Sequence, residues 1–255
     1  MVGIVDLATS VVERGVSGGE AGGCSVMGLS GVLRGGMLAA LLIGALPLAA
    51  CGGRVEHADS PPPVDQLANM LADESTINAI MGTTALRVYY TYRSLPGWPE
   101  GDVYSRPECL PQIANAMEAG YHGSHYGQMR GARLADDNSA ADPRSIDEAV
   151  VAFDSASAAQ AFVAASAQSW RPCVDAVLTI TSKNRPTQRW RMGSPRVVNG
   201  VQVVDADDPD STSGWRTSHA MRAADNVVVD VRVTDYAVSD QAVRVVNAIT
   251  GGNPL

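Results

Sequence analysis

Between residues 174 and 233 one strand-like segment follows another, with no helical pattern between them. The candidate strands are 174–181, 188–192, 196–204, 215–224 and 227–233. Asn199-Gly200 interrupts the third strand, and Asp225-Asn226 separates the last two. Both dipeptides are typical of tight turns. Strands joined by such turns pair antiparallel, so this region predicts an antiparallel meander.

Helical patterns lie on both sides of this meander in the sequence. The expected helices are one or two over 64–81 with Asp73 as an N-cap, one over 110–119, one after Asp154 that reaches Trp170, and a terminal helix capped by Ser239. Further strands are expected at 84–92, 121–134 and 148–153. Because strands and helices do not alternate regularly, the sequence predicts an α+β fold. We expect a single domain with an antiparallel β-sheet, helices packed on one face and one disulfide.

The last strand has a clear period of two. Its valines at 227, 229, 231 and 233 share one face, while Asp230 and Arg232 point the other way. The terminal helix has a matching apolar stripe of Ala242, Val245, Val246 and Ile249. We therefore expect these two faces to pack together. On this basis Val231→Asp should be severe, and Asp230→Ala nearly silent unless Asp230 faces a cleft and meets a ligand.

An uncharged apolar run covers residues 37–50 and is followed by Cys51. At 14 residues it is short for a membrane span and fits the apolar region of a signal peptide. Leu48-Ala49-Ala50-Cys51 resembles a bacterial lipobox, in which the cysteine thiol receives the lipid. We expect a signal peptide over 1–50, with Met27 as a candidate true start, and a lipidated tether over 51–63. Lipid on Cys51 would then hold the chain on the extracytoplasmic face of the cell membrane.

The chain has four cysteines, and two of them lie in the folded part. Cys24 falls in the signal segment, and Cys51 is the expected lipidation site. An even pair in an exported domain is typical of a disulfide, so Cys109 and Cys173 are expected to be bridged. The alternative is two separate reduced thiols. A zinc site is disfavoured, because no paired Cys or His stands close by in the sequence.

Charge and motif searches exclude several classes of function. A formal net charge of −8 disfavours a nucleic-acid binder, which needs a basic face. His122 and His125, taken as strand residues, would face opposite sides and not share a metal. Four aspartates over 205–210 could hold calcium but are better interpreted as a solvated loop. No Gly-x-Ser-x-Gly motif is present. We therefore expect no metal, no cofactor and no enzymatic activity.

Several features together resemble the mycobacterial family of PknH-like extracellular sensor domains, over roughly residues 64–250. They are Pro107-Glu108-Cys109 before a helix, Tyr121-His122-Gly123-Ser124, the segment 149–163 followed by Trp170-Arg171-Pro172-Cys173, Trp190, and Trp215 before Asn226-Val227-Val228-Val229-Asp230-Val231. The resemblance implies an extracytoplasmic domain that binds an unknown ligand in a cleft. Members often carry a second disulfide near the last hairpin. Here those neighbourhoods hold Ser218 and Thr234 instead.

Aromatic and arginine side chains are the candidate ligand-binding residues. They are Trp98, Tyr104, Tyr121, Trp190, Arg191 and Trp215. Indole and guanidinium groups can stack on a ligand or donate hydrogen bonds to it. The alternative is that the tryptophans are simply core residues in a chain poor in phenylalanine. The leading hypothesis is a lipid-anchored, non-enzymatic sensor-like domain for a small-molecule or cell-envelope ligand. The alternatives are a lipoprotein that binds another protein through a surface patch, and a hydrolase acting on envelope material.

Overall fold

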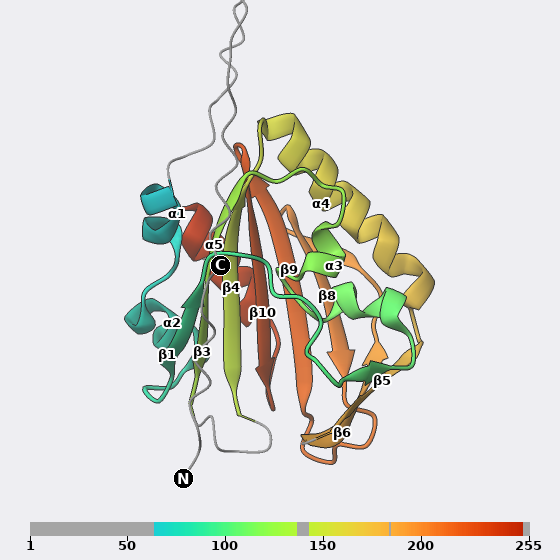
Figure 1. Ribbon diagram of the computed structural model, residues 1–255. Helices are drawn as coiled ribbons and strands as arrows, with labels where there is room; N and C mark the ends of the chain where they lie inside the picture. Colours follow the sequence, from blue (N-terminus) through green and yellow to red (C-terminus); the bar gives the residue numbers. More distant parts are fainter. Residues whose placement is uncertain (1–63, 137–142, 184, 252–255) are drawn as a thin grey trace, which may run out of the picture. The chain divides into compact units, whose positions relative to one another are not determined.

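The computed structural model describes residues 64–136, 143–183 and 185–251, and these form one ten-stranded antiparallel sheet (Figure 1). The strands are β1 (Arg87–Tyr92), β2 (Val103–Tyr104), β3 (Gln128–Ala135), β4 (Ser145–Ala152), β5 (Val177–Ser182), β6 (Arg185–Met192), β7 (Arg196–Val198), β8 (Val201–Asp207), β9 (Arg216–Ala224) and β10 (Val227–Asp235). Their order is β1-β3-β4-β10-β9-β8-β6-β5-β2, with β7 paired to β8. The predicted antiparallel α+β fold is confirmed.

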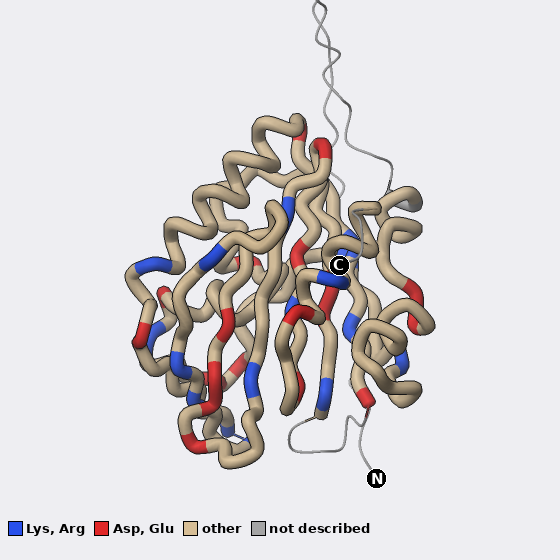
Figure 2. Tube along the Cα trace, turned by 180° about the vertical axis from the view of Figure 1, so that it is seen from behind, with Lys and Arg blue, Asp and Glu red and all other residues tan. Residues whose placement is uncertain are grey.

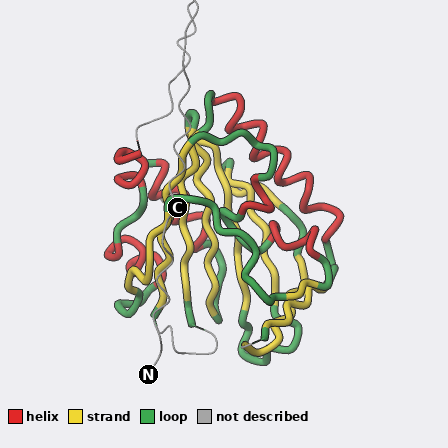
Figure 3. The backbone as a smooth tube through the Cα atoms, in the orientation of Figure 1, coloured by secondary structure: helices red, strands yellow, loops and turns green. Residues whose placement is uncertain are grey.

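Helices cover both faces of the sheet, not one face as the sequence suggested (Figure 3). The helices are α1 (Val64–Met70), α2 (Glu74–Met81), α3 (Glu118–Tyr121), α4 (Ala156–Trp170) and α5 (Gln241–Thr250), with 3-10 turns η1 (Pro107–Gln112) and η2 (Arg171–Cys173). α1, α2 and α5 pack on one face, and α4, α3, η1 and η2 on the other. The reason lies in the central strands: every residue of β4 is buried, so both of its sides need a cover.

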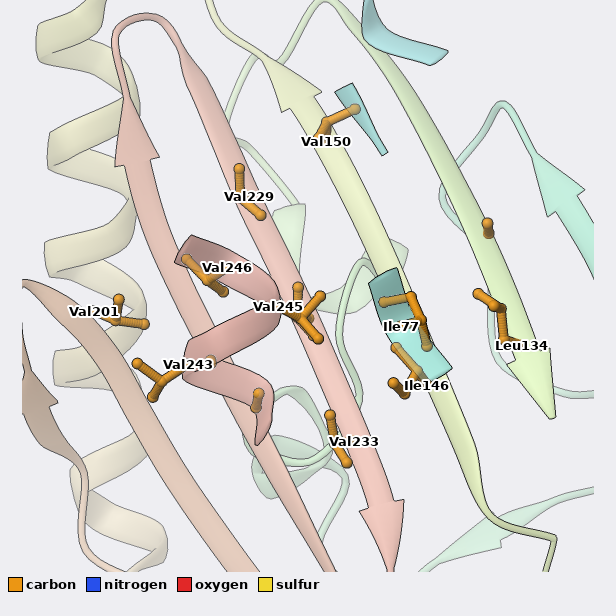
Figure 4. Close-up of a cluster of buried hydrophobic side chains, with 14 of the residues drawn as sticks. Ile77, Leu134, Ile146, Val150, Val201, Val229, Val233, Val243, Val245 and Val246 are labelled. Carbon is orange, nitrogen blue, oxygen red and sulfur yellow. The ribbon is translucent and has the colours of Figure 1, made fainter. Parts of the chain in front are cut away.

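The face under α5 is the valine-rich core that the alternation predicts. Val229 and Val233 of β10 lie against Val245 and Val246 of α5 (Figure 4). Val231 belongs to the same cluster and is fully buried. Burying a valine side chain contributes about 1.5–3 kcal/mol relative to exposure, so this stripe is a main source of stability. The packing of β10 on α5 is confirmed.

Both tight turns form where the sequence placed them. Asn199 and Gly200 have φ of 50° and 78° and connect β7 to β8, a conformation that suits this dipeptide. Asp225 has φ of 51° and turns β9 into β10. The partner of Thr234 across this hairpin is Thr217, whose hydroxyl oxygen lies 3.1 Å away. Ser218 is instead opposite Val233. Thr217 of β9 and Thr234 of β10 therefore face each other across the hairpin.

The segment before β3 differs from the expected strand. Tyr121 ends α3, and β3 begins only at Gln128, because Gly123 and His125 take positive φ values of 75° and 55° and turn the chain. The helix expected over 110–119 is broken into η1 and α3. Pro111 lies inside η1 and has no N–H to donate, which disfavours continuing the helix. The segment 113–117 between η1 and α3 is therefore a turn, and it borders the cleft described below.

Helix caps were predicted with mixed success. Asp73 is the N-cap of α2, and its carboxylate accepts from the N–H of Thr76 at 2.7 Å. For α4 the cap is Ser155, one residue after the expected Asp154, and its hydroxyl accepts from the N–H of Ala158. For α5 the cap position is Asp240, not Ser239. These boundaries shift by one residue without changing which face each helix buries.

Cys109 and Cys173 form the expected disulfide, with their Cα atoms 5.6 Å apart. It joins η1 to η2 at the end of α4. The predicted signal peptide, lipidation at Cys51 and tether over 51–63 lie outside the described residues. No helix among those described is long and apolar enough to cross a membrane.

Candidate functional site

A cavity of about 440 Å³, which we call the main cleft because it holds buried polar groups, lies on the face of the sheet that α4 covers. Its walls are η1, the turn after η1, α3 and α4, and its floor is formed by His219 and Met221 of β9 and Asp230 of β10. Trp98, in the loop between β1 and β2, is 44% exposed and also lines it. Segments far apart in the sequence thus converge on one cavity.

Asp230 lies on the floor of the main cleft and is fully buried. One carboxylate oxygen is 2.6 Å from Nε2 of His219. The other accepts from the hydroxyl of Tyr121 at 2.8 Å and from the N–H of Ala116 at 2.9 Å. Burial and the neighbouring carboxylate raise the pKa of Tyr121 well above its ordinary value, so this hydroxyl remains a donor. Asp230→Ala was expected to be nearly silent unless Asp230 faces a cleft and meets a ligand, and Asp230 does line a cleft. Because the substitution would leave three buried groups without their partner, we now expect it to be destabilising.

Both ring nitrogens of His219 are engaged. Nδ1 is 3.1 Å from the carbonyl oxygen of Gln112, which can only accept, so Nδ1 carries a hydrogen. Nε2 lies 2.6 Å from a carboxylate oxygen of Asp230, within hydrogen-bond distance. The ring also lies against Trp170, with centroids 4.9 Å apart. His219 is therefore held in one orientation and has no free nitrogen to accept a proton from a third group.

Aromatic rings form the apolar side of the main cleft. Tyr121 and Phe162 have ring centroids 4.3 Å apart, and Phe162 also contacts Phe153 at 5.2 Å. Trp98 makes an edge contact with Tyr104, with centroids 4.7 Å apart. The cleft thus combines apolar walls with a small set of oriented polar groups at its floor. This combination is typical of sites that bind small molecules.

A second, smaller hollow of about 160 Å³ lies on the other side of η1, and we call it the basic hollow. It is lined by three arginines, Arg133 of β3, Arg185 of β6 and Arg232 of β10. Trp190 of β6 and Trp215, just before β9, also line it. Ala114, in the turn after η1, borders both hollows, so this turn separates them.

The predicted ligand residues divide between these two hollows. Trp98 and Tyr121 line the main cleft, and Trp190 and Trp215 line the basic hollow. Both Trp190 and Trp215 are buried, as the core interpretation also expected. Tyr104 contacts Trp98 but lines neither hollow, and Arg191 is exposed on the opposite side of β6 from Trp190. The structure therefore does not bring these six residues together.

The sequence analysis raised a cleft position only for Asp230 and missed the other residues at the centre of each hollow. His219, Asp230 and Trp170 belong to the main cleft, and Arg133 and Arg232 to the basic hollow. One feature of the sequence could have indicated these residues: Asp230 and Arg232 are the polar positions of the segment 227–233, which otherwise consists of valines. A charged residue on the second face of a central strand indicates that this face is not an ordinary apolar core.

Three aspartates of the acidic segment 205–210 form ion pairs with arginines. Asp205 pairs with Arg196, Asp207 with Arg216 and Asp210 with Arg189. Figure 2, which shows the molecule from behind, has acidic and basic residues close together at its lower left. Within the described part of the chain, no group of three or more His, Cys, Asp or Glu residues is arranged to hold a metal ion.

Fold and site together define a class: a single-sheet α+β domain with a disulfide-anchored turn over a cleft with an Asp–His pair at its floor. The chain belongs to the family of PknH-like extracellular domains, which it matches over residues 62–251. This family assignment confirms the resemblance seen in the sequence.

The relatives include mycobacterial kinases. The chain is 30% identical over 214 residues to the serine/threonine-protein kinase PknH of Mycobacterium bovis, covering 80% of this chain and 34% of the kinase. It is 26% identical over 151 residues to the kinase PknJ of Mycobacterium tuberculosis, covering 58% and 26% of the two chains. The crystal structure of the extracellular domain of PknH from M. tuberculosis is similar with a TM-score of 0.68 and 27% identity, covering 75% of this chain and 96% of that one. The chain thus spans about a third of the length of its PknH relatives.

Proposed function

We propose that this chain is a lipid-anchored, extracytoplasmic, sensor-like domain that binds a small-molecule or cell-envelope ligand in the main cleft. The observation that carries the proposal is the combination of aromatic walls with the oriented groups Asp230, His219 and Tyr121 at the floor. Ligand sites are concave, largely apolar and pre-formed, with few polar groups that fix orientation. Membership of the family of PknH-like extracellular domains supports the extracytoplasmic location.

The ligand proposal is tested by filling the cleft. Ser166 of α4 lines it, and a tryptophan there would occupy the space a ligand needs. Gln168 lies on the same helix, is exposed and lines neither hollow, so Gln168→Trp is the matched control. The full chain and both variants are purified from a mycobacterial host. Bound molecules are then extracted and identified by mass spectrometry.

We expect a molecule that co-purifies with the unmodified chain and with Gln168→Trp, and is depleted about tenfold or more in Ser166→Trp. Circular dichroism checks that the variants are folded. A set of bound molecules that is the same in all three proteins, or empty in all three, would contradict ligand binding in this cleft.

The hydrolase alternative is not favoured by the geometry. A serine nucleophile needs a base within hydrogen-bond reach. His219, in the main cleft, has both nitrogens engaged by Asp230 and the carbonyl of Gln112. The hydroxyl of Ser169, which also lines the cleft, donates to the carbonyl of Ser166 at 2.8 Å. Ser169 and His219 are therefore not arranged as a nucleophile and its base for acyl transfer.

Protein binding remains a second candidate because of strand β1. It is an edge strand of the sheet, and Val88, Tyr89 and Tyr90 are 45–58% exposed on it. An exposed edge strand offers unpaired main-chain groups, and tyrosine is enriched in protein interfaces. A Tyr89→Glu variant that loses a cross-linked envelope partner while retaining its cleft ligand would favour this function.

Lipid anchoring leads to a separate prediction. Cys51→Ala removes the thiol that would receive the lipid, so the variant should accumulate as unprocessed or released precursor. The measurement is cell fractionation with mass determination of the mature chain. Ser60→Ala in the same tether is the control and should behave like the unmodified chain. Unchanged processing and membrane retention of Cys51→Ala would contradict lipidation.

A further inference from the structure

Among the residues that the structure describes, the basic hollow has three arginines and two carboxylates paired with them. The arginines come from β3, β6 and β10, which are far apart in the sequence. The two carboxylates are Asp102, which pairs with Arg185 at 2.7 Å, and Asp147, which lies between Arg133 and Arg232. From these contacts we infer that the hollow binds the phosphate group of an anionic ligand.

Asp147 is a weak counter-charge for two arginines. Its Oδ2 is 4.0 Å from Nη1 of Arg133 and 3.9 Å from Nη2 of Arg232, too far for a hydrogen bond to either. Its Oδ1 already accepts from the hydroxyl of Tyr92 at 2.5 Å and from the amide of Asn115 at 3.3 Å. This one carboxylate thus accepts two hydrogen bonds and is also the ion-pair partner of two arginines. Neither guanidinium makes the short bidentate contact with it that arginine prefers with an anion.

Arg232 has an unused donor. Its Nε is buried and has no hydrogen-bond partner. A buried donor without a partner is destabilising, so such a group calls for an explanation, for example an ion or water. Burial, together with the charge of Arg133, lowers the pKa of Arg232, which is the expected direction where positive charge is crowded. An anion bound in the hollow would relieve this crowding of positive charge.

The size and lining of the hollow favour a single phosphate group. Its volume of about 160 Å³ corresponds to roughly five water molecules in the liquid, which suits a phosphate with a few attached atoms. Guanidinium groups match phosphate oxygens in geometry and charge. Gln188 adds an amide, and the indoles of Trp190 and Trp215 provide apolar walls for whatever carries the phosphate. The group could belong to free phosphate or to a phosphate ester.

The test is a titration of the purified, folded chain followed by its tryptophan fluorescence and by calorimetry. The probes are inorganic phosphate and glycerol 3-phosphate, with acetate as a reference anion at the same ionic strength. Trp190 and Trp215 line the hollow, so binding should change their emission. We expect saturable binding of a phosphate probe and none of acetate. Tighter binding of glycerol 3-phosphate indicates an ester as the natural ligand, and equal binding indicates free phosphate.

Variants locate the binding. Arg133→Gln and Arg232→Gln should each weaken phosphate binding about tenfold or more, since each removes a charge-assisted hydrogen bond. Arg191→Gln is the matched control: it removes the same charge from the opposite side of β6 and should leave binding unchanged. Arg185→Gln, at a side chain 58% exposed, provides a third variant if Arg232→Gln does not fold.

The inference is independent of the ligand in the main cleft, because Ser166→Trp fills that cleft and leaves the basic hollow untouched. We expect this variant to bind phosphate normally. Absence of saturable phosphate binding, equal binding of acetate, or equal loss in Arg191→Gln would overturn the phosphate site without affecting the proposal for the main cleft.

Discussion

Val231→Asp should lower the free energy of unfolding by on the order of 4 kcal/mol or more. Val231 is fully buried in the core under α5, so the substitution removes apolar contacts and introduces a carboxylate into an apolar cluster. Its cross-strand partner on β4 is Glu148, another buried acid. Small domains are stable by only about 5–15 kcal/mol, so much of the folded population would be lost. Urea denaturation followed by circular dichroism measures the change.

The matched control is Val197→Asp. Val197 is on β7 and is 66% exposed, so the same chemical change should alter the unfolding free energy by about 0.5 kcal/mol or less. A Val231→Asp protein as stable as Val197→Asp would contradict the assignment of the two faces of β10. Asp230→Ala, on the other face, should now also be destabilising, because it leaves His219 and Tyr121 without their shared acceptor.

Glu148→Gln should stabilise the protein, and increasingly so as the pH rises. Glu148 is fully buried, and burial raises the pKa of its carboxyl from 4.5 to about 8. One oxygen accepts from the N–H of Ala72 at 3.2 Å, and the other has no partner. Below pH 4.5 folded and unfolded chains are both protonated. Between pH 4.5 and 8 the unfolded chain releases this proton while the folded chain retains it, so stability falls as the pH rises.

The size of this effect follows from the shift in pKa. About 3.5 pH units at roughly 1.4 kcal/mol each give a loss of up to about 5 kcal/mol, complete above pH 8. Glutamine keeps an acceptor for the N–H of Ala72 and has no charge to bury. Urea denaturation at pH 5, 6, 7 and 8 should show the two proteins diverging steadily. The exposed Glu100→Gln is the control, and parallel curves for Glu148→Gln and the unmodified chain would contradict this account.

Local patterns were enough to predict much of the fold. The turns at Asn199-Gly200 and Asp225-Asn226, the valine face of β10 and the stripe of α5 depend on neighbours in the sequence, and all formed as expected. The Cys109–Cys173 bridge followed from the number of cysteines in an exported chain. The sequence analysis did not predict that helices pack on the second face of the sheet. The residues of a segment such as 148–153 do not by themselves show that both sides of the strand are buried.

The site was harder to predict because it depends on pairing between distant strands. His219 and Asp230 meet only through the register of β9 on β10 and the position of the turn after η1. Arg133 and Arg232 both flank Asp147 only because β4 lies between β3 and β10. Arg191 was expected to accompany Trp190 as its neighbour, yet alternate residues of a strand face opposite ways. Proximity in sequence was a poor guide to proximity in the site.

Because the disulfide joins η1 to η2, we expect a reducing agent to change the structure mainly around these two turns. Cys109–Cys173 fixes η1, which separates the two hollows, to η2 at the end of α4. At β9 and β10 the hairpin is held by main-chain ladders and by the hydrogen-bonded hydroxyls of Thr217 and Thr234, which are insensitive to thiols. We therefore expect chemical reduction to alter the wall between the hollows more than the sheet beneath it. On this basis the redox state of the two cysteines would change the shape of the hollows more than the integrity of the fold.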